Sequence, residues 1–419
     1  MNYFLDPVFR APILGALLMC LSASLIGVIA YIRRRSLVSE TLSHATYPGI
    51  VLGACIATFD VSMLIGAFVS ALAALWLVHA MQTRLKLSSD AVLCAVLVTF
   101  LGLGVLIASH LQFSNPKLYS KVQVFLFGQA ATLMDVHIVM YAALAAVVIL
   151  FLAFHFHSLK AINFDRLFSQ SIGLKIKWID TLTLILLALA VVIGIRSVGV
   201  VLISGMLVAP AIAARKLTHK LSIMLIIAGG IGMISGFVGT WLSIEMRSLH
   251  LPTGPLIVAV ASLICMLTML FSKEQGLIAR GVRVLVFRRQ CKIENVLKSL
   301  WKSGQTDLRS LSGHLGIRPL SGRMVLSRLI RQGWCETCQG KYALTTDGKR
   351  RASHIVRLHR LWEVYLTSQL GMTADKVHRS AEEMEHILSP DLEIRLIELL
   401  KNPKKDPHAQ PIPKKEHFS

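Results

Sequence analysis

Long apolar segments separated by short charged loops occupy the first two thirds of the chain, and they constrain its fold more than any other feature. The first segment, residues 11–32, is followed directly by Arg33, Arg34 and Arg35. It is too long for the core of a secretory signal and lacks a small-residue cleavage site, so we interpret it as a membrane span. The pattern as a whole predicts about nine transmembrane helices. The second span begins near Glu40 and includes 47–59, and the others lie at 62–82, 91–110, 134–156, 179–195, 199–214, 221–244 and 255–272.

The charged residues divide the chain into two parts. The whole chain has 16% charged and 54% apolar residues, which excludes a single large soluble enzyme. Residues 273–419 carry 27 Lys and Arg against 15 Asp and Glu, a net charge of +12, which leaves +9 of the total +21 for residues 1–272. A polytopic membrane part is therefore expected to precede a basic, water-compatible part.

Basic residues also indicate which loops face the cytoplasm, because Lys and Arg are retained on that side of the membrane. Alternate loops differ clearly, since one set has many basic residues and the other has few. We therefore expect the N-terminus outside and the C-terminal part in the cytoplasm. The basic set contains Arg33, Arg34, Arg35, Arg84, Lys86, Lys160, Arg166, Lys175, Lys177, Arg215, Lys216 and Lys220, and the other set contains Lys117, Lys121, Arg196 and Arg247.

The seven cysteines are too scattered for a disulfide framework, and a reducing compartment is expected for the basic part. Cys335 and Cys338 form one CxxC motif without a second pair nearby. Because a structural zinc site needs four ligands, a hairpin turn is the favoured interpretation of this motif over a zinc site.

Two ionisable residues stand at the second predicted span, where a charge is costly unless it is paired or hydrated. Glu40 and His44 are four residues apart, so a helix places them on one face. A carboxylate and an imidazole that converge form half of a divalent-metal site, which two symmetric copies or a related partner subunit would complete. The alternative, which the spacing alone favours, is an interfacial pair that caps and orients the span.

The basic pair of Arg34 and Arg35 and the segment SETLSHATYPG at residues 39–49 form a specific motif. It resembles a signature of the manganese, zinc and iron permeases of ABC transporters. The resemblance covers residues 1–272. Its other parts are Phe127 with Gly128, the stretch 199–220 that contains VAPAIAAR, and LPTGP at residues 251–255.

The resemblance implies that Glu40 and His44 line the path of the transported metal. Ser39 and Glu40 stand where the family has Gly and Asp, so the carboxylate side chain is one methylene longer in this chain. The family also implies three partners, which are a second permease subunit, an ABC ATPase and an extracytoplasmic metal-binding protein.

A phosphate loop of the GxxxxGK[ST] type is missing from the sequence, so no nucleotide is expected to bind and ATP hydrolysis must come from a partner. The segment 211–220 follows a helix break predicted at Pro210 and has the place of the family's coupling helix, which docks on the ATPase. Ala211, Arg215 and Lys216 are its candidate contact residues. An ordinary positive-inside loop is the alternative.

A linker at residues 273–291 is predicted to join the two parts. Its arginines suit anionic headgroups, and its expected exposure makes it a candidate for proteolytic release of the C-terminal part. The competing hypothesis is that the C-terminal part acts from the membrane, within the full-length chain.

A helix-turn-helix pattern follows the linker, within residues 292–350. Residues 307–315 predict a short helix capped by Asp307, 316–317 a tight turn, and 319–331 a second helix that begins with Pro. A basic hairpin at 334–345 would add a wing. The second helix has an apolar stripe of Val325, Leu326, Leu329 and Ile330, and its polar side would enter the DNA major groove. The candidate DNA-binding residues are Arg318, Ser321, Arg323, Ser327 and Arg328.

His and Glu recur at helical spacing in the last part of the chain. Two groups that face each other across two helices would repel one another unless a cation or protons intervene. A solvated acidic face is the alternative. The groups are His359 with Glu363, and His378 with Glu382, Glu385 and His386.

The segments HRLWE at 359–363 and VHRSAEEMEHILS at 377–389 resemble the metal-binding motifs of the diphtheria toxin repressor family. The resemblance covers about residues 292–413 and implies that all six His and Glu side chains are metal ligands. Glu382 stands where iron-type members have Cys, and oxygen ligands suit Mn(II) or Fe(II) as co-repressor. The ligands that the family places on its first helix fall near Asn295 and Lys298.

These observations predict an all-α polytopic membrane domain of about nine transmembrane helices, a small winged helix-turn-helix domain, and a helical metal-binding and dimerisation domain at residues 351–419. We interpret the chain as the inner-membrane permease of an ABC importer for iron, manganese or zinc, fused to a cytoplasmic repressor that binds operator DNA as a homodimer. This arrangement resembles the permease–repressor chains of chlamydiae. No enzymatic activity is expected. The alternative is a membrane-anchored metal-sensing regulator that does not transport.

Overall fold

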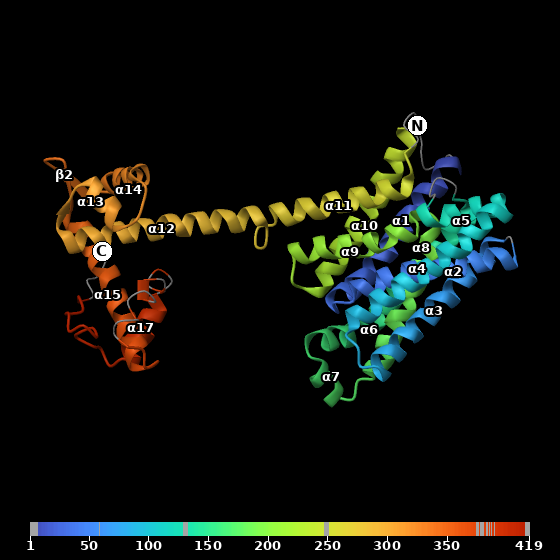
Figure 1. Ribbon diagram of the computed structural model, residues 1–419, viewed down its shortest axis with the longest axis horizontal. Helices are drawn as coiled ribbons and strands as arrows, with labels where there is room; N and C mark the ends of the chain where they lie inside the picture. Colours follow the sequence, from blue (N-terminus) through green and yellow to red (C-terminus); the bar gives the residue numbers. More distant parts are fainter. Residues whose placement is uncertain are drawn as a thin grey trace. The chain divides into compact units, whose positions relative to one another are not determined.

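The structure is a computed structural model, and the chain forms two compact units, Met1–Arg280 and Gly281–Ser419 (Figure 1). The first unit contains the predicted spans and the second contains the predicted regulator. The residues that the structure describes are 7–57, 59–128, 133–246, 251–373, 377, 381–382, 384, 386, 388 and 390–414.

Long helices make up the first unit, as the apolar segments predict. Eight of the described helices are long and apolar enough to cross a membrane. Helix α2 (Ser36–Ile56) has 21 residues, but its Ser, Thr, Glu and His side chains make it less apolar. With α2, the helices account for all nine predicted segments. The eight are α1 (Pro7–Ile32), α3 (Asp60–Arg84), α4 (Ser89–Ser114), α6 (Asp135–Phe164), α8 (Ile176–Val198), α9 (Val200–Leu217), α10 (Leu221–Glu245) and α11 (Thr253–Phe271), and the shorter α5 (Pro116–Phe127) and α7 (Arg166–Ser171) lie between them.

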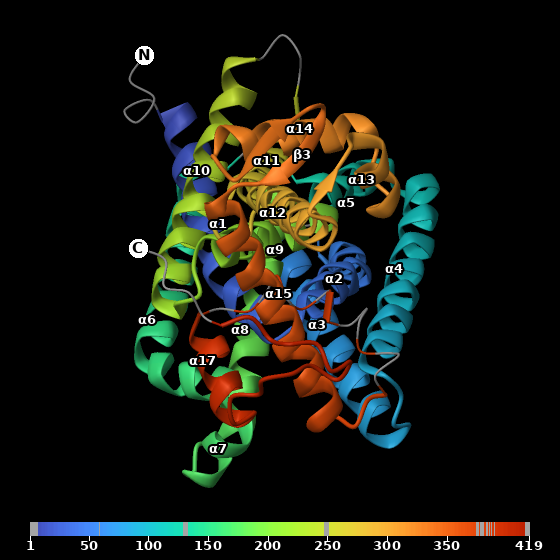
Figure 2. The same ribbon diagram turned by 90° about the vertical axis from the view of Figure 1, so that its left-hand side faces the viewer.

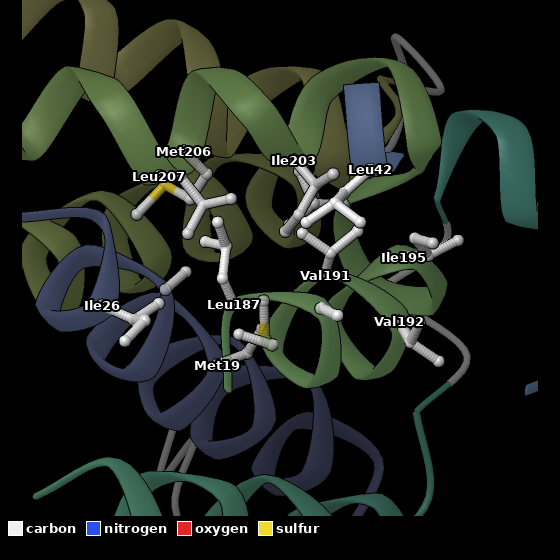
Figure 3. Close-up of a cluster of buried hydrophobic side chains, with 14 of the residues drawn as sticks. Met19, Ile26, Leu42, Leu187, Val191, Val192, Ile195, Ile203, Met206 and Leu207 are labelled. Carbon is white, nitrogen blue, oxygen red and sulfur yellow. The ribbon is translucent and has the colours of Figure 1, made fainter. Parts of the chain in front are cut away.

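Helix α1 lies at the centre of this unit, in contact with α6, α8, α9 and α10. In the buried cluster of Figure 3, Met19 of α1 lies with Leu187 of α8 and Leu207 of α9. Helices α1 and α9 approach closely because Gly27 has no side chain, and a Cβ at that position would lie 2.0 Å from the carbonyl oxygen of Leu207. Small residues at such crossings are typical of membrane proteins, where close packing holds the helices together.

Helix α2 packs against α3 and α4 (Figures 1 and 2), and the end of the SETLSHATYPG segment makes these contacts. A Cβ on Gly49 would lie 2.1 Å from the carbonyl oxygen of Gly66 in α3. A Cβ on Gly104 of α4 would lie 2.5 Å from Cδ1 of Tyr47. The helix continues through Pro48, which membrane helices tolerate. The YPG part of the motif therefore has a packing role.

Three arginines from two separate segments, the loop between α1 and α2 and the start of α7, converge on one carboxylate at one end of this unit. The Oδ1 atom of Asp180 lies 2.6 Å from Nη1 of Arg33, and its Oδ2 atom lies 2.8 Å from Nη2 of Arg166 and 3.7 Å from Nη2 of Arg35. Burial lowers the pKa of Arg33, and the Asp180 carboxylate opposes this shift. All three arginines belong to the basic set of loops, so their meeting agrees with the predicted cytoplasmic side.

The predicted linker is largely helical. Helix α12 runs without interruption from Leu277 to Ser303, so it includes most of residues 273–291 and continues into the regulator. Residues 280–290 are all exposed, as expected. However, a helix must open locally before a protease can cut it, so exposure by itself does not favour cleavage here. The sequence between 282 and 303 contains no Gly or Pro that would end the helix.

The second unit contains the predicted winged helix domain. The Asp307 carboxylate caps α13 (Leu308–His314) by accepting hydrogen bonds from the backbone N–H groups of Arg309 and Ser310. Gly316, with φ of 60°, makes the turn to α14 (Pro319–Arg331). The wing is an antiparallel sheet of order β1-β3-β2, formed by β1 (Gln305–Thr306), β2 (Cys335–Cys338) and β3 (Lys341–Leu344).

Helices α15 (Thr346–Ser368) and α17 (Pro390–Leu399) form the rest of the second unit. Arg357 of α15 makes a buried ion pair with Glu393 of α17, with 3.3 Å between Nε and Oε1. Arg357 also donates a hydrogen bond of 2.6 Å to the carbonyl oxygen of Pro413, and Arg360 lies 3.4 Å from Asp406. The segment 403–413, which resembles the end of a dimerisation domain, is therefore attached to α15 by these two arginines.

Candidate metal-binding and DNA-binding sites

Glu40 and His44 lie on the least buried side of α2. Thirteen of the 21 residues of this helix are buried, whereas Glu40 is exposed and His44 is half-buried. In the described part of the chain, the buried Nδ1 atom of His44 has no hydrogen-bond partner. A carboxylate and an imidazole on the same side of a helix suit a divalent cation as cargo.

The predicted coupling segment does not have the expected form. Helix α9 continues through Pro210 to Leu217, so the break predicted at Pro210 is wrong. Membrane helices tolerate an internal Pro because neighbouring helices satisfy the freed backbone groups. Ala211 is completely buried and does not reach the surface, which excludes it as a contact residue. Arg215 and Lys216 are half-buried in the last turn of α9.

Helix α7 has the exposure that a docking helix needs, although the sequence reasoning passed over it. It is a six-residue helix between α6 and α8, and the Asp165 carboxylate caps it by accepting from the N–H of Phe168. The side chains of Leu167 and Phe168 are 79% and 57% exposed. Exposed apolar side chains that lie together outside the membrane core are typical of contact surfaces. The sequence signal that could have predicted this exposed helix is the apolar pair of Leu167 and Phe168 within a polar loop.

Helix α14 presents its predicted polar side to solvent. Val325, Leu326 and Leu329 are buried in the core of the winged helix domain, but Ile330 is 41% exposed, so its assignment to the apolar stripe is wrong. Ile330 follows Leu329 directly, and successive residues on a helix point in different directions. Of the candidate DNA-binding residues, Ser321 is half-buried and the exposed ones are Arg318, Arg323, Ser327 and Arg328.

The CxxC motif does not converge on a metal. Cys335 and Cys338 stand at the two ends of strand β2, where Cys335 is buried and Cys338 is exposed. Residues three apart on a strand point to opposite faces. Burial raises the pKa of the Cys335 thiol to about 11, which disfavours the thiolate that a metal needs. The hairpin interpretation is confirmed by the turn at Gln339 and Gly340, both at positive φ.

His359 and Glu363 form a buried pair on α15, as their spacing predicts. Nε2 of His359 lies 3.1 Å from Oε1 of Glu363, and both side chains are almost completely buried. The other ring nitrogen, Nδ1, lies 3.3 Å from Nζ of Lys298 on α12. Lys298 also lies 3.6 Å from Oε1 of Glu382. A lysine ammonium group thus stands among three of the predicted metal ligands.

His386 meets a carboxylate that the sequence reasoning missed. Its Nδ1 atom lies 2.5 Å from Oε2 of Glu294 on α12, and the His386 side chain is 6% exposed. The structure therefore places Glu294, and not the neighbouring Asn295, against the predicted ligands. Glu294 and Lys298 are four residues apart on one helix, and this spacing could have predicted that both side chains lie on the same face of α12. His354 lines the same cavity of about 310 Å³.

Two of the six predicted regulator ligands, His378 and Glu385, lie outside the described residues. Within the described residues, groups of three or more His, Cys, Asp or Glu side chains that could hold a metal ion do not occur. An imidazole and a carboxylate at the Glu294–His386 pair fit one divalent ion, which further ligands would complete. The His359–Glu363 pair fits an ion less well, because the Lys298 ammonium group lies beside it.

Residues 5–272 match the ABC 3 transport family, and residues 345–414 match the metal-binding and dimerisation domain of iron dependent repressors. The chain is 34% identical to a probable metal transport system membrane protein of Chlamydia trachomatis, over 99% of this chain and 98% of that protein. It is 30% identical to the manganese transport system membrane protein MntC of Bacillus subtilis, over 85% of this chain and 84% of that protein. It is 32% identical to the zinc transport system membrane protein TroC of Treponema pallidum, over 66% of this chain and 93% of that protein.

A solved structure, PsaBC from Streptococcus pneumoniae in complex with Fab, has the fold of the membrane unit. It matches with a TM-score of 0.58 and 23% identity, covering 64% of this chain and 94% of that chain. The chain therefore belongs to the ABC 3 transport family, as a multi-pass inner-membrane protein that also carries an iron dependent repressor metal-binding and dimerisation domain.

Proposed function

We propose that the membrane unit is the permease of an ABC importer for manganese, iron or zinc, and that the second unit is a metal-dependent repressor. The observation that carries the transport function is the polar side of α2, where the exposed Glu40 and the half-buried His44 lie one helical turn apart on a helix with thirteen of its 21 residues buried. Two relatives named as manganese and zinc transport proteins support this class of cargo.

The exposure of Glu40 favours a second permease subunit. An ionisable side chain that faces lipid is costly, so such residues usually face a protein neighbour or a water-filled path. A partner that covers this side of α2 would remove Glu40 from lipid and bring a second set of ligands to the cation. Two pairs of Glu and His suffice for the coordination of one transition-metal ion.

Two cytoplasmic elements support the docking of an ABC ATPase, which would supply the ATP hydrolysis. Helix α7 offers the exposed apolar residues Leu167 and Phe168. Arg215, at the end of α9, lines a cavity of about 940 Å³ together with the basic residues Arg34 and Lys160. An extracytoplasmic metal-binding protein would deliver the cargo to the opposite side.

The repressor function rests on the exposed basic side of α14. Arg323, Ser327 and Arg328 are in a position to contact base edges or phosphates of operator DNA. When Mn(II) or Fe(II) is bound, it would tie α12 to the segment after α15 through Glu294, His386 and the predicted ligand Glu385. The exposed apolar residues Leu392, Ile394 and Leu399 of α17 support a homodimer of this unit, which a palindromic operator requires.

The second candidate function is a membrane-anchored metal sensor that does not transport. The observation that favours it is the continuous helix α12, which begins at Leu277, shortly after the end of α11 at Phe271, and runs to Ser303 in the second unit. The two candidates differ in whether Glu40 and His44 are needed for metal uptake.

The transport test measures metal accumulation in cells that express the whole transporter operon. Glu40→Ala and His44→Ala should each abolish uptake, because each removes a ligand of the cation. His79→Ala, on the exposed side of α3, is the matched control and should leave uptake unchanged. Normal uptake by the Glu40→Ala/His44→Ala double variant, correctly assembled with its ATPase, would refute the role of these two residues as ligands on the path of the metal.

The repressor test measures binding of promoter DNA from the same operon to the purified full-length chain, with and without a chelator. Arg323→Ala should weaken binding at saturating metal by about 1–3 kcal/mol, or about five- to 150-fold. Arg288→Ala removes the same charge from the exposed part of α12 and should leave the affinity unchanged. Equal affinity for the promoter in metal and in chelator would contradict the repressor function.

A further inference from the structure

Lys298 has an environment that is unusual for a lysine. Its side chain is only 7% exposed, although lysines are rarely buried unless they are paired. It projects from α12 to Nδ1 of His359 at 3.3 Å and to Oε1 of Glu382 at 3.6 Å. His359 in turn contacts Glu363 at 3.1 Å. The ammonium group thus has the partners that a metal ion would have at this position.

The chemistry of this group excludes a divalent ion beside it. A transition-metal ion held by His359 and Glu382 would lie within a few ångströms of the ammonium nitrogen, in a buried place where charge repulsion is poorly screened. The ammonium group has no lone pair, so it does not serve as a ligand. The ammonium group already supplies a positive charge beside the carboxylate of Glu382. The ion and the lysine therefore exclude each other.

Among the described residues, the pair of Glu294 and His386 has no ammonium group between its side chains. Its two side chains are 2.5 Å apart, and His354 lines the same cavity. Arg351 also lines this cavity, but it is exposed and its guanidinium carbon lies over the Trp334 ring, 4.2 Å from the ring centroid. Glu294 precedes Lys298 by one helical turn, so α12 presents an anionic side chain to one half of the regulator's ligands and a cationic side chain to the other half.

We propose that Lys298 is a built-in cation that replaces one of two metal ions in the regulator, so that each chain responds to a single ion held at Glu294 and His386. This inference rests on the proposed repressor function. The contact between α12 and His359 of α15 then forms without metal. Only the contact between α12 and His386 depends on the metal ion. The metal response of one chain follows a simple one-site curve.

The test is a Mn(II) titration of the purified full-length chain, followed by metal analysis and by electron paramagnetic resonance. Glu40→Ala and His44→Ala are included in every sample to remove the transport ligands. We expect one Mn(II) per chain with the signal of an isolated ion. Lys298→Glu, which replaces the cation by a carboxylate ligand, should raise the count to two and give the signal of a spin-coupled pair.

Two further variants make the outcome decisive. Lys292→Glu makes the same charge change at an exposed position of α12 and should keep the count at one. Lys298→Met removes the charge without adding a ligand, and should lower the melting temperature of the metal-free protein more than that of the metal-bound protein. Two coupled Mn(II) ions in the protein with Lys298 intact would overturn the inference and leave the repressor function standing. No Mn(II) in any variant would overturn both.

Discussion

The crossing of α2 and α3 allows a sharp test of how this membrane unit is held together. Gly49→Ala places a methyl group where the structure has 2.1 Å to the carbonyl oxygen of Gly66 and 2.6 Å to Cβ of Ser70. Ordinary contacts begin near 3.4 Å, so the two helices must separate by about 1 Å. The nearest atom to the new methyl group is a backbone carbonyl oxygen, and a backbone atom cannot move aside by a change of rotamer.

The expected magnitude is the difference of two effects. Overpacking a well-packed site costs about 1–3 kcal/mol. Replacing Gly by Ala inside a helix gains about 0.5–1 kcal/mol through helix propensity. Gly49→Ala should therefore destabilise the membrane unit by about 1–2 kcal/mol. Gly102→Ala on α4 is the matched control, because a Cβ there meets nothing within 4 Å, and it should leave stability unchanged or raise it slightly.

The measurement is the unfolding midpoint of the purified protein in mild detergent, by heating and by titration with a denaturing detergent. Gly49→Ala should unfold earlier than the unmodified protein in both experiments, and Gly102→Ala should not. If the two variants are equally stable, close backbone packing at Gly49 is not what holds α2 against α3.

Two further predictions concern other parts of the chain. Asp180→Asn should destabilise the membrane unit by about 3–5 kcal/mol, because it leaves the buried guanidinium group of Arg33 without its carboxylate. The measurement is thermal unfolding, and the control is Asp90→Asn, which changes an exposed Asp at the start of α4. Equal melting temperatures of the two variants would contradict the prediction. Iodoacetamide at neutral pH should alkylate Cys338 in minutes and leave Cys335 unmodified in the native protein, since burial raises the pKa of the Cys335 thiol to about 11. Mass spectrometry of tryptic peptides detects the difference. Equal labelling of the two cysteines would mean that β2 does not bury Cys335.

Features that depend on neighbouring residues could be predicted from the sequence. The membrane helices follow from the length of the apolar segments. The bounds of α14 follow from Pro319 at its start, and the Asp307 cap of α13 follows from a local hydrogen bond. The pairing of His359 with Glu363 follows from their spacing of four residues on a helix.

The prediction that depended on a conformational break was less successful. Pro210 was expected to end a helix, but packing against neighbouring helices lets α9 continue. The linker at 273–291 stays a prediction, and the structure adds that α12 extends through most of it, since residues 282–303 contain no Gly or Pro. At Pro210 the local signal was weaker than the continuity of the helix.

The sequence by itself determined the membrane spans, the two helices of the helix-turn-helix and the chemical types of the predicted metal ligands, because hydropathy, capping and helical spacing act over a few residues. Only the tertiary structure decided which of these side chains meet. His386 and Glu294 are 92 residues apart in the sequence, and His359 and Lys298 are 61 apart. Such distant contacts depend on how α12 packs in the second unit, and a shift of one residue along that helix turns a different side chain toward the site. For this reason the fold, and not the sequence, showed that Glu294 and Lys298 contact the predicted ligands.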